Sequence, residues 1–283
     1  MQGEIRFGPA GIPIQCEGST VEGVECCSKL GLTAMEMEFV RGVRMKEEQA
    51  KEVRKKAQEL DISLSSHAPY YVNLCSLEEE KIANSKRNIF QSAQATEWAG
   101  GRITVFHPGY YQELSKEEAY KVAKKNLVEI GETLKSHKIN VILGAETVGK
   151  KSQFGGFNEC IKLSEELDFI QPVIDFSHLH ARRDFNILSE EQYQQIFSTL
   201  EKHLGDYVRH FHSHFSEINY SDKGELNHLA LGTNGEPPLT PLLNVLAENG
   251  YSGTIICETP KIELDSLKMK KEYENILKEK KTK

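Results

Sequence analysis

The sequence has no uninterrupted run of about 18 apolar residues, so it predicts no membrane-spanning helix. Its first residues, MQGEIRFGPAGIP, contain Glu4 and Arg6 and no apolar core, which is unlike a secretory signal. CxxC pairs are also absent, and the six cysteines are scattered, with Cys257 inside the apolar segment TIIC. We therefore expect a cytoplasmic protein with reduced, partly buried thiols and no membrane partner.

Basic residues are outnumbered by acidic ones, 35 Lys and Arg against 42 Asp and Glu, which gives a formal net charge of −7. Taken alone, this balance argues against a nucleic-acid partner, because phosphate binding usually leaves a basic surface. Divalent metal ions change that argument, since a bound ion is often the largest local charge in its site. A nucleic-acid function therefore stays open for a protein that binds metal.

Short apolar segments rich in β-branched residues recur along the chain and predict eight strands, at 5–8, 34–39, 62–66, 103–106, 140–143, 172–174, 207–211 and 254–257. Charged amphipathic segments between them predict helices at 46–60, 77–99, 116–135, 157–167, 189–204, 239–249 and 265–279. This alternation predicts βα units around a parallel sheet.

Eight such units over 283 residues fit a closed (β/α)8 TIM barrel. We expect one α/β domain over residues 1–283, with a charged C-terminal helix at about 265–283. An open doubly wound sheet is the alternative. It would normally carry a GxGxxG turn, and the first turn here reads FGPAGIP instead.

Six of the predicted strands are followed by a side chain that binds metal ions well: His67, His107, Glu146, Asp175, His212 and Glu258. The carboxyl ends of barrel strands meet at one rim, where active sites of TIM barrels lie. Imidazoles mixed with carboxylates, without thiolates, favour zinc, manganese or iron over magnesium or calcium. Six ligands exceed one tetrahedral zinc site and predict at least two ions, which we expect Glu146 to bridge. Paired ions activate water and hold phosphoryl oxygens.

Further histidines gather in the same part of the chain. In HFHSHF, strand alternation sends His210, His212 and His214 to one face, so they cannot all bind one ion. We expect His212 to be the ligand, with His210 buried below it. We then expect His180 to lie behind the metal ligands and support them. His214 is expected either in the same role or in contact with the substrate. Hydrogen bonding or helix capping would explain any one of the strand-end histidines and carboxylates alone. The stability of a barrel, however, does not require six such groups on one rim.

The ordered segments HAPYYVNL, FHPGYY, GAETVGK, IDFSHLHAR, HFHSHFS and CETP resemble the endonuclease IV family, the zinc-dependent apurinic/apyrimidinic endonucleases with a xylose isomerase-like TIM barrel. The resemblance runs from RFGPAGIP to ICETP, nearly the whole chain. It implies a barrel that holds three zinc ions and hydrolyses the phosphodiester 5′ to abasic sites in double-stranded DNA during base excision repair.

The resemblance also implies roles for individual residues. His67, His107 and Glu146 match the first zinc site, and Glu146, Asp175, His212 and Glu258 match the second. His178 and His228 match two ligands of the third. We expect Glu146 and Glu258 to be catalytic. Tyr70 matches a tyrosine that enters the DNA at the lesion, and Tyr71, Asn73 and Arg41 are further expected DNA contacts.

Two departures distinguish this chain from the family pattern. Leu226 stands where the family has an aspartate two residues before the histidine matched by His228, and Glu225 and Asp222 are near but out of register. The HxHFS segment replaces the HxND of bacterial members. We therefore expect two to three zinc ions, or manganese, in a monomeric divergent member. The alternatives are a sugar isomerase or epimerase using manganese or magnesium, and a non-catalytic binder of damaged DNA.

Overall fold

The computed structural model describes residues 3–282. Its main sheet has eight parallel strands in the order β1-β12-β9-β8-β6-β4-β3-β2. Their bounds are β1 Ile5–Pro9, β2 Ala34–Glu38, β3 Ser63–His67, β4 Ile103–Phe106, β6 Ile142–Glu146, β8 Ile170–Asp175, β9 Phe211–Phe215 and β12 Gly253–Cys257. The two end strands meet through Thr33 N–H to the Phe7 carbonyl (3.0 Å) and Gly11 N–H to the Glu36 carbonyl (2.9 Å). The sheet is therefore a nearly closed barrel, which confirms the predicted (β/α)8 fold.

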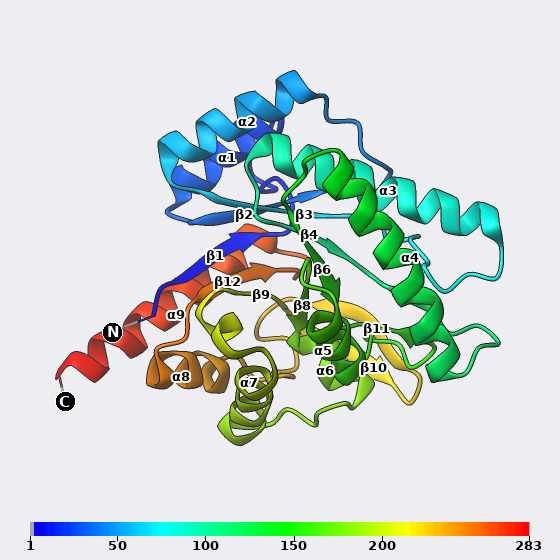
Figure 1. Ribbon diagram of the computed structural model, residues 1–283. Coiled ribbons are helices and arrows are strands. Elements are labelled where there is room, and N and C mark those ends of the chain that lie inside the picture. The colour runs from blue at the N-terminus through cyan, green and yellow to red at the C-terminus, as the bar shows by residue number, and fades with distance from the viewer. Residues whose placement is uncertain (1–2, 283) are drawn as a thin grey trace.

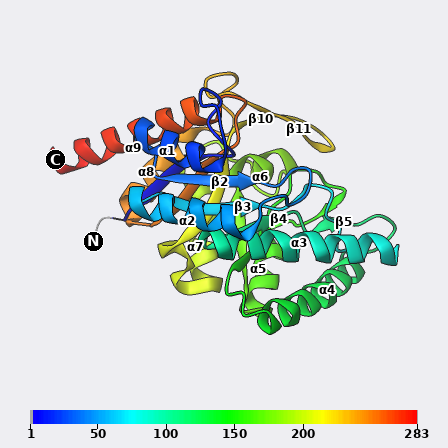
Figure 2. The same cartoon turned by 90° about the horizontal axis from the view of Figure 1, so that it is seen from above.

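The helices surround this barrel (Figure 1). Within residues 3–282 they are α1 Thr20–Leu30, α2 Glu47–Leu60, α3 Glu79–Ala99, α4 Lys116–Ser136, α5 Phe157–Glu166, α6 Phe176–Arg182, α7 Glu190–Leu204, α8 Leu239–Asn249 and α9 Ile262–Thr282. Two small antiparallel pairs lie among the connections, β5 (Gly109–Tyr110) with β7 (Gln153–Phe154), and β10 (Glu217–Ser221) with β11 (Gly224–Leu229). The β10–β11 hairpin projects beside α6 (Figure 2).

Local sequence signals fix the helix ends. Ser115 accepts the Glu118 N–H at the start of α4, and the Glu118 carboxylate accepts the Ser115 N–H (2.9 Å), a complete capping box. Gly31 ends α1 with φ 79°, a left-handed conformation that glycine adopts without strain. Helix α4 then buries one apolar face, including Leu127 and Ile130, against the barrel.

One strand lies four residues later than predicted. The segment at 207–211 was expected to be the seventh strand, but Gly205–Arg209 forms a short 3₁₀ helix and β9 begins at Phe211. Tyr207 and Val208 are buried in the apolar core, and the Tyr207 hydroxyl donates to the Pro172 carbonyl (2.7 Å). Their apolar character therefore reflects burial in a turn below the barrel, not membership of a strand.

The C-terminal helix is part of the barrel wall. It begins at Ile262, three residues before the expected start, and Lys283 lies outside the described residues. Met269 and Tyr273 are buried, and the Tyr273 ring packs 5.8 Å from Phe7. No helix within residues 3–282 is long and apolar enough to cross a membrane.

The cysteines follow the expectation in part. Cys27, Cys75, Cys160 and Cys257 are buried free thiols, as expected. Cys16 and Cys26 instead form a disulfide, so the prediction of reduced thiols was wrong for this pair. They lie ten residues apart, between the loop after β1 and the middle of α1, and the folding of that loop onto α1 brings them together.

Candidate metal centre

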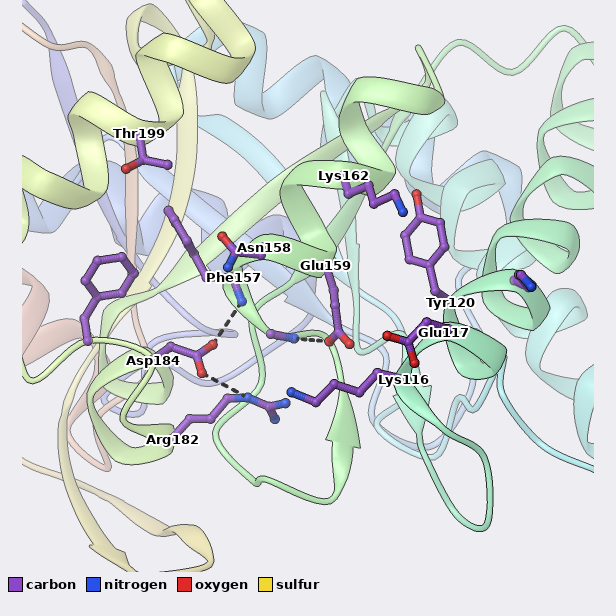
Figure 3. A pocket seen from close by; sticks show the side chains of 13 residues that line it. Lys116, Glu117, Tyr120, Phe157, Asn158, Glu159, Lys162, Arg182, Asp184 and Thr199 are labelled. Carbon is purple, nitrogen blue, oxygen red and sulfur yellow. Dashed lines mark hydrogen bonds and ion pairs between the residues drawn. The ribbon is translucent and has the colours of Figure 1, made fainter.

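A polar cavity of about 550 Å³ lies on the outside of the barrel, between α4, α5 and α7 (Figure 3). Three of its charged groups, those of Glu159, Arg182 and Asp184, hold the fold together. Asp184 accepts the Phe157 N–H (3.0 Å) and lies 3.4 Å from Arg182, while the Glu159 carboxylate accepts the N–H groups of Gly155 and Gly156. These groups already have partners within the fold, so the cavity offers no free cluster among them.

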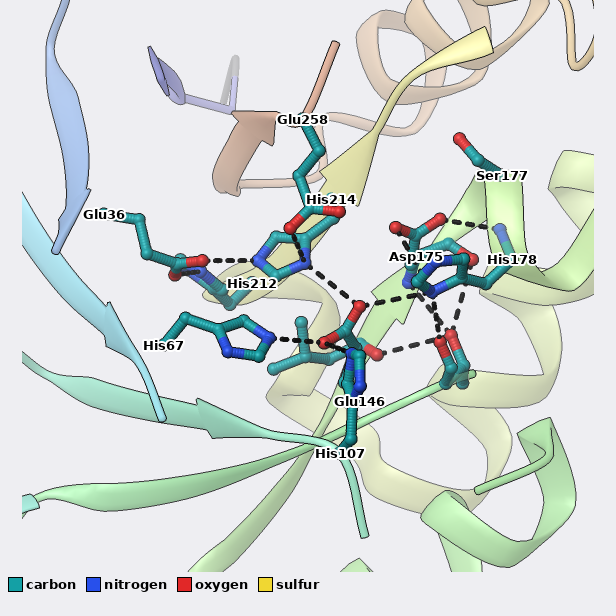
Figure 4. Close-up of polar contacts among 12 residues, drawn as sticks. Glu36, His67, His107, Glu146, Asp175, Ser177, His178, His212, His214 and Glu258 are labelled. Atoms are coloured by element: carbon teal, nitrogen blue, oxygen red, sulfur yellow. Dashed lines mark hydrogen bonds and ion pairs between the residues drawn. The ribbon is translucent and has the colours of Figure 1, made fainter. Parts of the chain in front are cut away.

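The strand ends bring together histidine and carboxylate side chains from most of the barrel (Figure 4). His67, Glu146 and Asp175 are the last residues of β3, β6 and β8, while His107 and Glu258 directly follow β4 and β12. His67, Glu146 and Asp175 are fully buried. The side chains form three adjacent groups, and within each group the possible ligand atoms lie within 4.8 Å of one another.

The first group consists of His67, His107 and Glu146. The Nε2 atoms of both histidines face the Glu146 Oε2, at 2.8 Å from His67 and 2.9 Å from His107. The His67 Nδ1 lies 2.7 Å from the Ala68 carbonyl oxygen, which can only accept a hydrogen bond. In the neutral ring this contact leaves the Nε2 lone pair directed at the carboxylate.

The second group consists of Glu146, Asp175, His214 and Glu258. The His214 Nδ1 lies 3.3 Å from an oxygen of Glu146 and 3.3 Å from an oxygen of Glu258. Glu146 thus belongs to both groups, and its bridging of two ions stays a prediction.

His214, not His212, is the β9 residue of this group. The register of the sheet pairs His214 with Asp175, the last residue of β8, so that both lie at the rim. His212 lies two residues earlier, one pleat deeper in the barrel, where its Nε2 contacts Glu36 at 2.9 Å. The structure thus places His214, and not the expected His212, beside Glu146 and Glu258, because β9 extends four residues beyond its predicted end.

The third group consists of Asp175, His178, His228 and Glu258. The His178 Nδ1 lies 2.9 Å from the Thr147 carbonyl, and the His228 Nδ1 lies 2.9 Å from the Ser216 hydroxyl. Their Nε2 atoms face each other at 3.2 Å. In the neutral ring the Thr147 carbonyl accepts from the His178 Nδ1, so the Nε2 lone pair of His178 faces the His228 nitrogen, where either a ring N–H or a shared cation can satisfy it.

Glu225 completes the third group from the β10–β11 hairpin. Its carboxylate oxygens lie 3.5 Å from His178 Nε2 and 3.9 Å from His228 Nε2. The hairpin register shifts between Asn219 and Tyr220, which pair with Asn227 and Glu225, so Leu226 is an extra residue in a β-bulge. A bulge reverses the alternation of side chains, which turns Glu225 to the face of His228 and leaves Leu226 56% exposed.

The electrostatics of the two shared glutamates differ. Burial alone would raise the pKa of Glu146, but the His107 and His214 charges, with hydrogen bonds from His107 and His178, hold it well below its ordinary value. Burial raises the pKa of Glu258 well above its ordinary value, and the Glu146 and Asp175 charges add to that rise. The pKa values of two carboxyl groups in one site are thus shifted in opposite directions, a pattern typical of functional sites.

These residues fit divalent metal ions. Asp175 Oδ2 is buried and has no hydrogen-bond partner within residues 3–282. Burial would lower the pKa values of His178 and His214, but the converging carboxylates raise them well above the ordinary value, and a divalent cation can supply the positive charge in place of these protons. Mixed nitrogen and oxygen ligands without thiolate suit zinc or manganese.

An open cleft of about 540 Å³ lies over the three groups and gives access to them. It is lined by His107, His178, His228, Glu225, Glu258 and the Tyr70 side chain, among others. Tyr70 is 40% exposed, its hydroxyl donates to Glu38 (3.1 Å), and its ring lies tilted beside that of His67 with 4.8 Å between ring centroids. A ligand entering the cleft therefore meets the Tyr70 ring beside the first group.

The other expected DNA contacts have different environments. Arg41 and Tyr71 are exposed on the loops that follow β2 and β3. Asn73 is buried, and its side-chain oxygen accepts the backbone N–H groups of Cys75 (3.1 Å) and Tyr110 (3.0 Å). Asn73 therefore fixes two rim loops to each other, a structural role that the sequence did not predict.

Two further histidines lie away from the three groups. His180 is buried between Tyr220 and Glu236, with its Nε2 3.5 Å from the Glu236 carboxylate. His210 was expected to be buried beneath His212, but it is exposed at the opposite end of the barrel, beside Gln171. The reason is again the start of β9 at Phe211, which leaves His210 outside the strand.

A family model described as xylose isomerase-like TIM barrel matches residues 24–279. The chain belongs to this family. An uncharacterized family relative from Methanocaldococcus jannaschii is 40% identical over 273 residues, which cover 96% of this chain and 98% of the relative. A probable endonuclease 4 of Aquifex aeolicus is 25% identical over 200 residues, covering 69% of this chain and 70% of the relative.

Solved structures of the same architecture include both nucleases and sugar epimerases. Endonuclease IV of Thermus thermophilus has a TM-score of 0.70 at 19% identity, over 97% of this chain and 99% of the other. A D-tagatose 3-epimerase-like protein has a TM-score of 0.72 at 20% identity, with the same coverage. At these identities the likeness establishes the fold, and the choice between the two activities depends on the site itself.

Proposed function

We propose that this xylose isomerase-like barrel is a metal-dependent endonuclease that hydrolyses the phosphodiester 5′ to abasic sites in double-stranded DNA. The observation that carries the proposal is the presence of three adjacent ligand groups sharing Glu146, Asp175 and Glu258. A single-ion centre needs only one such group. Three groups side by side suit a cluster of ions acting on one phosphate. The similarity to a probable endonuclease 4 supports the same assignment.

Three zinc ions are the proposed complement. His67, His107 and Glu146 would hold one, Glu146, Asp175, His214 and Glu258 a second, and His178, His228 and Glu225 a third. Ions held in this way lower the pKa of a water and neutralise charge on phosphate oxygens. Because they also bring positive charge to an acidic chain, the net charge of −7 does not exclude a DNA substrate.

The chain's own residues define how a phosphate would be bound and oriented. Glu146 is fixed by contacts from His67, His107 and His178, which prevents it from turning away from the centre. The exposed Tyr70 ring at the mouth is placed to stack in the gap left by a missing base. An abasic nucleotide has no base pair to break, so its backbone can be drawn into the cleft at low cost.

The direct test is cleavage of a duplex oligonucleotide containing one abasic-site analogue, using protein purified without added metal. We expect about three zinc ions per chain by elemental analysis, a single nick 5′ to the lesion, and no cleavage of the matched intact duplex. Removal of metal with a chelator should abolish the nick, and zinc should restore it.

Glu146→Gln provides the matched control, because it keeps the shape of the side chain and removes its charge. We expect the activity to fall by more than about 100-fold, since even residues that only support metal ligands contribute 10–100-fold. A folded, metal-loaded Glu146→Gln protein that cleaves normally would refute the proposal. Tight binding of abasic DNA without cleavage would identify a non-catalytic binder of damaged DNA.

A second candidate, a sugar epimerase or isomerase using manganese or magnesium, is favoured by one specific feature. The group of Glu146, Asp175, His214 and Glu258 places two glutamates in a single ion site, one with its pKa lowered and one with its pKa raised. Such a pair can act as base and acid on a bound sugar. Turnover of ketoses with manganese, together with one ion per chain and an uncut abasic duplex, would select this function.

A further inference from the structure

Beneath the three ligand groups, the barrel interior contains a second layer of polar side chains. Glu36 on β2 and His212 on β9 are both almost completely inaccessible. The Glu36 Oε2 accepts a hydrogen bond from the Ser65 hydroxyl (2.6 Å) and lies 2.9 Å from the His212 Nε2. The strand segment AMEME thus directs a glutamate into the barrel, although burial of a charged group is costly without a partner.

The other oxygen of Glu36 faces the metal ligand His214. Its Oε1 lies 2.8 Å from the His214 Nε2, a close charge contact, and both atoms are buried without a hydrogen-bond partner in residues 3–282. The opposite ring nitrogen of His214, Nδ1, is directed at Glu146 and Glu258. Figure 4 shows this arrangement, with His214 between Glu36 on one side and Glu146 and Glu258 on the other.

We propose that Glu36 is a positioning residue that holds His214 in the tautomer protonated on Nε2, so that Nδ1 offers its lone pair to the ion bound with Glu146, Asp175 and Glu258. The inference rests on the proposed metal centre but not on DNA as the substrate. It follows from the contacts on both nitrogens of the His214 ring, because a neutral imidazole has one donor and one acceptor nitrogen. A carboxylate on the donor nitrogen orients the ring and increases the basicity of the ligand nitrogen.

Glu36 is itself held rigidly, as a positioning residue must be. Its carbonyl accepts the Gly11 N–H (2.9 Å) where the barrel closes, and Ser65 and His212 fix the carboxylate from two directions. His212 reaches Glu36 but is not a member of the groups formed by Glu146, Asp175 or Glu258. Because His212 supports the Glu36 carboxylate, His212→Gln tests through the number of bound ions, not their affinity, whether His212 itself binds an ion.

The main alternative is that Glu36, His212 and His214 hold an ion of their own, since their ligand atoms lie within 4.8 Å of one another. The two possibilities differ in the number of ions. A positioning role leaves His212 without any bound ion. A separate ion would need His212 as a ligand, because Glu36 and His214 alone supply only two side chains.

The test is a zinc titration of the metal-free protein against a competing chelator, for wild type, Glu36→Gln and His212→Gln. We expect Glu36→Gln to weaken one ion by about 10–100-fold, the range found for partners behind metal ligands, and to leave the other ions unchanged. His212→Gln should keep the full number of ions. Unchanged zinc affinities in a folded Glu36→Gln protein, or loss of an ion in His212→Gln, would overturn the proposal.

A second measurement uses the unmodified protein, so its result does not depend on whether a variant folds. In ¹⁵N spectra of the zinc-loaded protein, His214 should carry its proton on Nε2 and show the metal-induced shift on Nδ1. The reverse assignment would overturn the proposal. Neither readout involves DNA, so failure to cut an abasic duplex would refute the nuclease function and leave this inference standing.

Discussion

At the scale of single residues, Glu225 marks a departure from the endonuclease IV pattern that segments of this chain resemble. The bulge at Leu226 brings Glu225 to 3.5 Å from His178 and 3.9 Å from His228, so we expect it to replace the aspartate of the third site. Glu225→Gln should reduce the zinc content by one ion and slow cleavage by 10-fold or more, on the order of other metal-site losses. Metal analysis and single-turnover cleavage measure both effects.

Leu226→Asp is the control for that prediction. It restores the family residue at the sequence level, but the side chain at 226 is 56% exposed and turned away from His228. It should therefore leave the zinc content and the activity unchanged. Recovery of the third ion by Leu226→Asp in a Glu225→Gln background would show that the hairpin changes register and that the bulge does not determine the ligand.

Residue-level reasoning from the sequence predicted that side chains at the strand ends meet at one rim, as they do in the structure, because strand-end positions follow directly from the barrel pattern. It missed Glu36, although a signal was present. Glu36 and Glu38 alternate within the otherwise apolar strand AMEME, and charged residues facing the inside of a buried parallel strand need partners there. The sequence could not reveal that Glu36 faces His214, because the inward side chains of β2 and β9 come together only in the closed barrel.

At the scale of elements, helices were easier to predict than strand ends. Helix α8 was predicted at its observed bounds, and α4 within one residue, because caps and apolar periodicity mark helices locally. The start of β9 was wrong by four residues because Tyr207 and Val208 are apolar for a different reason, burial in a 3₁₀ turn. A register error of that kind moves a ligand by two positions, which is how His212 came to be expected in place of His214.

The cap of α4 gives a prediction at the same scale. Ser115 provides the side-chain oxygen of the capping box, so Ser115→Ala should lower the free energy of unfolding by about 1 kcal/mol. Ser136→Ala at the other end of the helix is the control, because Ser136 is exposed and caps no N–H group. Chemical denaturation measures both. Equal effects of the two substitutions would mean that the capping box adds no measurable stability.

At the scale of the whole molecule, the closed barrel explains why residues distant in sequence form one centre. Glu36 and His212 are separated by 176 positions, yet the closure of β1 against β2 brings both strands into the same interior. Composition and periodicity were sufficient to predict this closure, since eight βα units leave few other arrangements. They did not predict the disulfide between Cys16 and Cys26 or the β10–β11 hairpin, which depend on the conformations of individual loops.

Metal removal should therefore destabilise the whole barrel, and the effect should depend on pH. In the metal-free protein burial alone would lower the pKa of His67, but the Glu146 hydrogen bond and nearby carboxylates raise it to about 10. The unfolded residue titrates near 6.5. This proton stabilises the folded chain fully below that value, and the contribution is lost as the pH rises towards 10. Burial would likewise lower the pKa values of His178 and His214, but carboxylates raise them well above the ordinary value, so their contributions have the same sign.

Zinc reverses this trend, because it replaces the protons on its ligands and binds more tightly as they are lost. From pH 7 to pH 9 we expect the Tm of the metal-free protein to fall, and the gap between zinc-loaded and metal-free protein to widen. Calorimetry at constant free zinc in both buffers measures this gap. A gap that stays constant or narrows would show that the buried histidines are not protonated in the metal-free barrel, and that the carboxylates of the centre are neutralised in some other way.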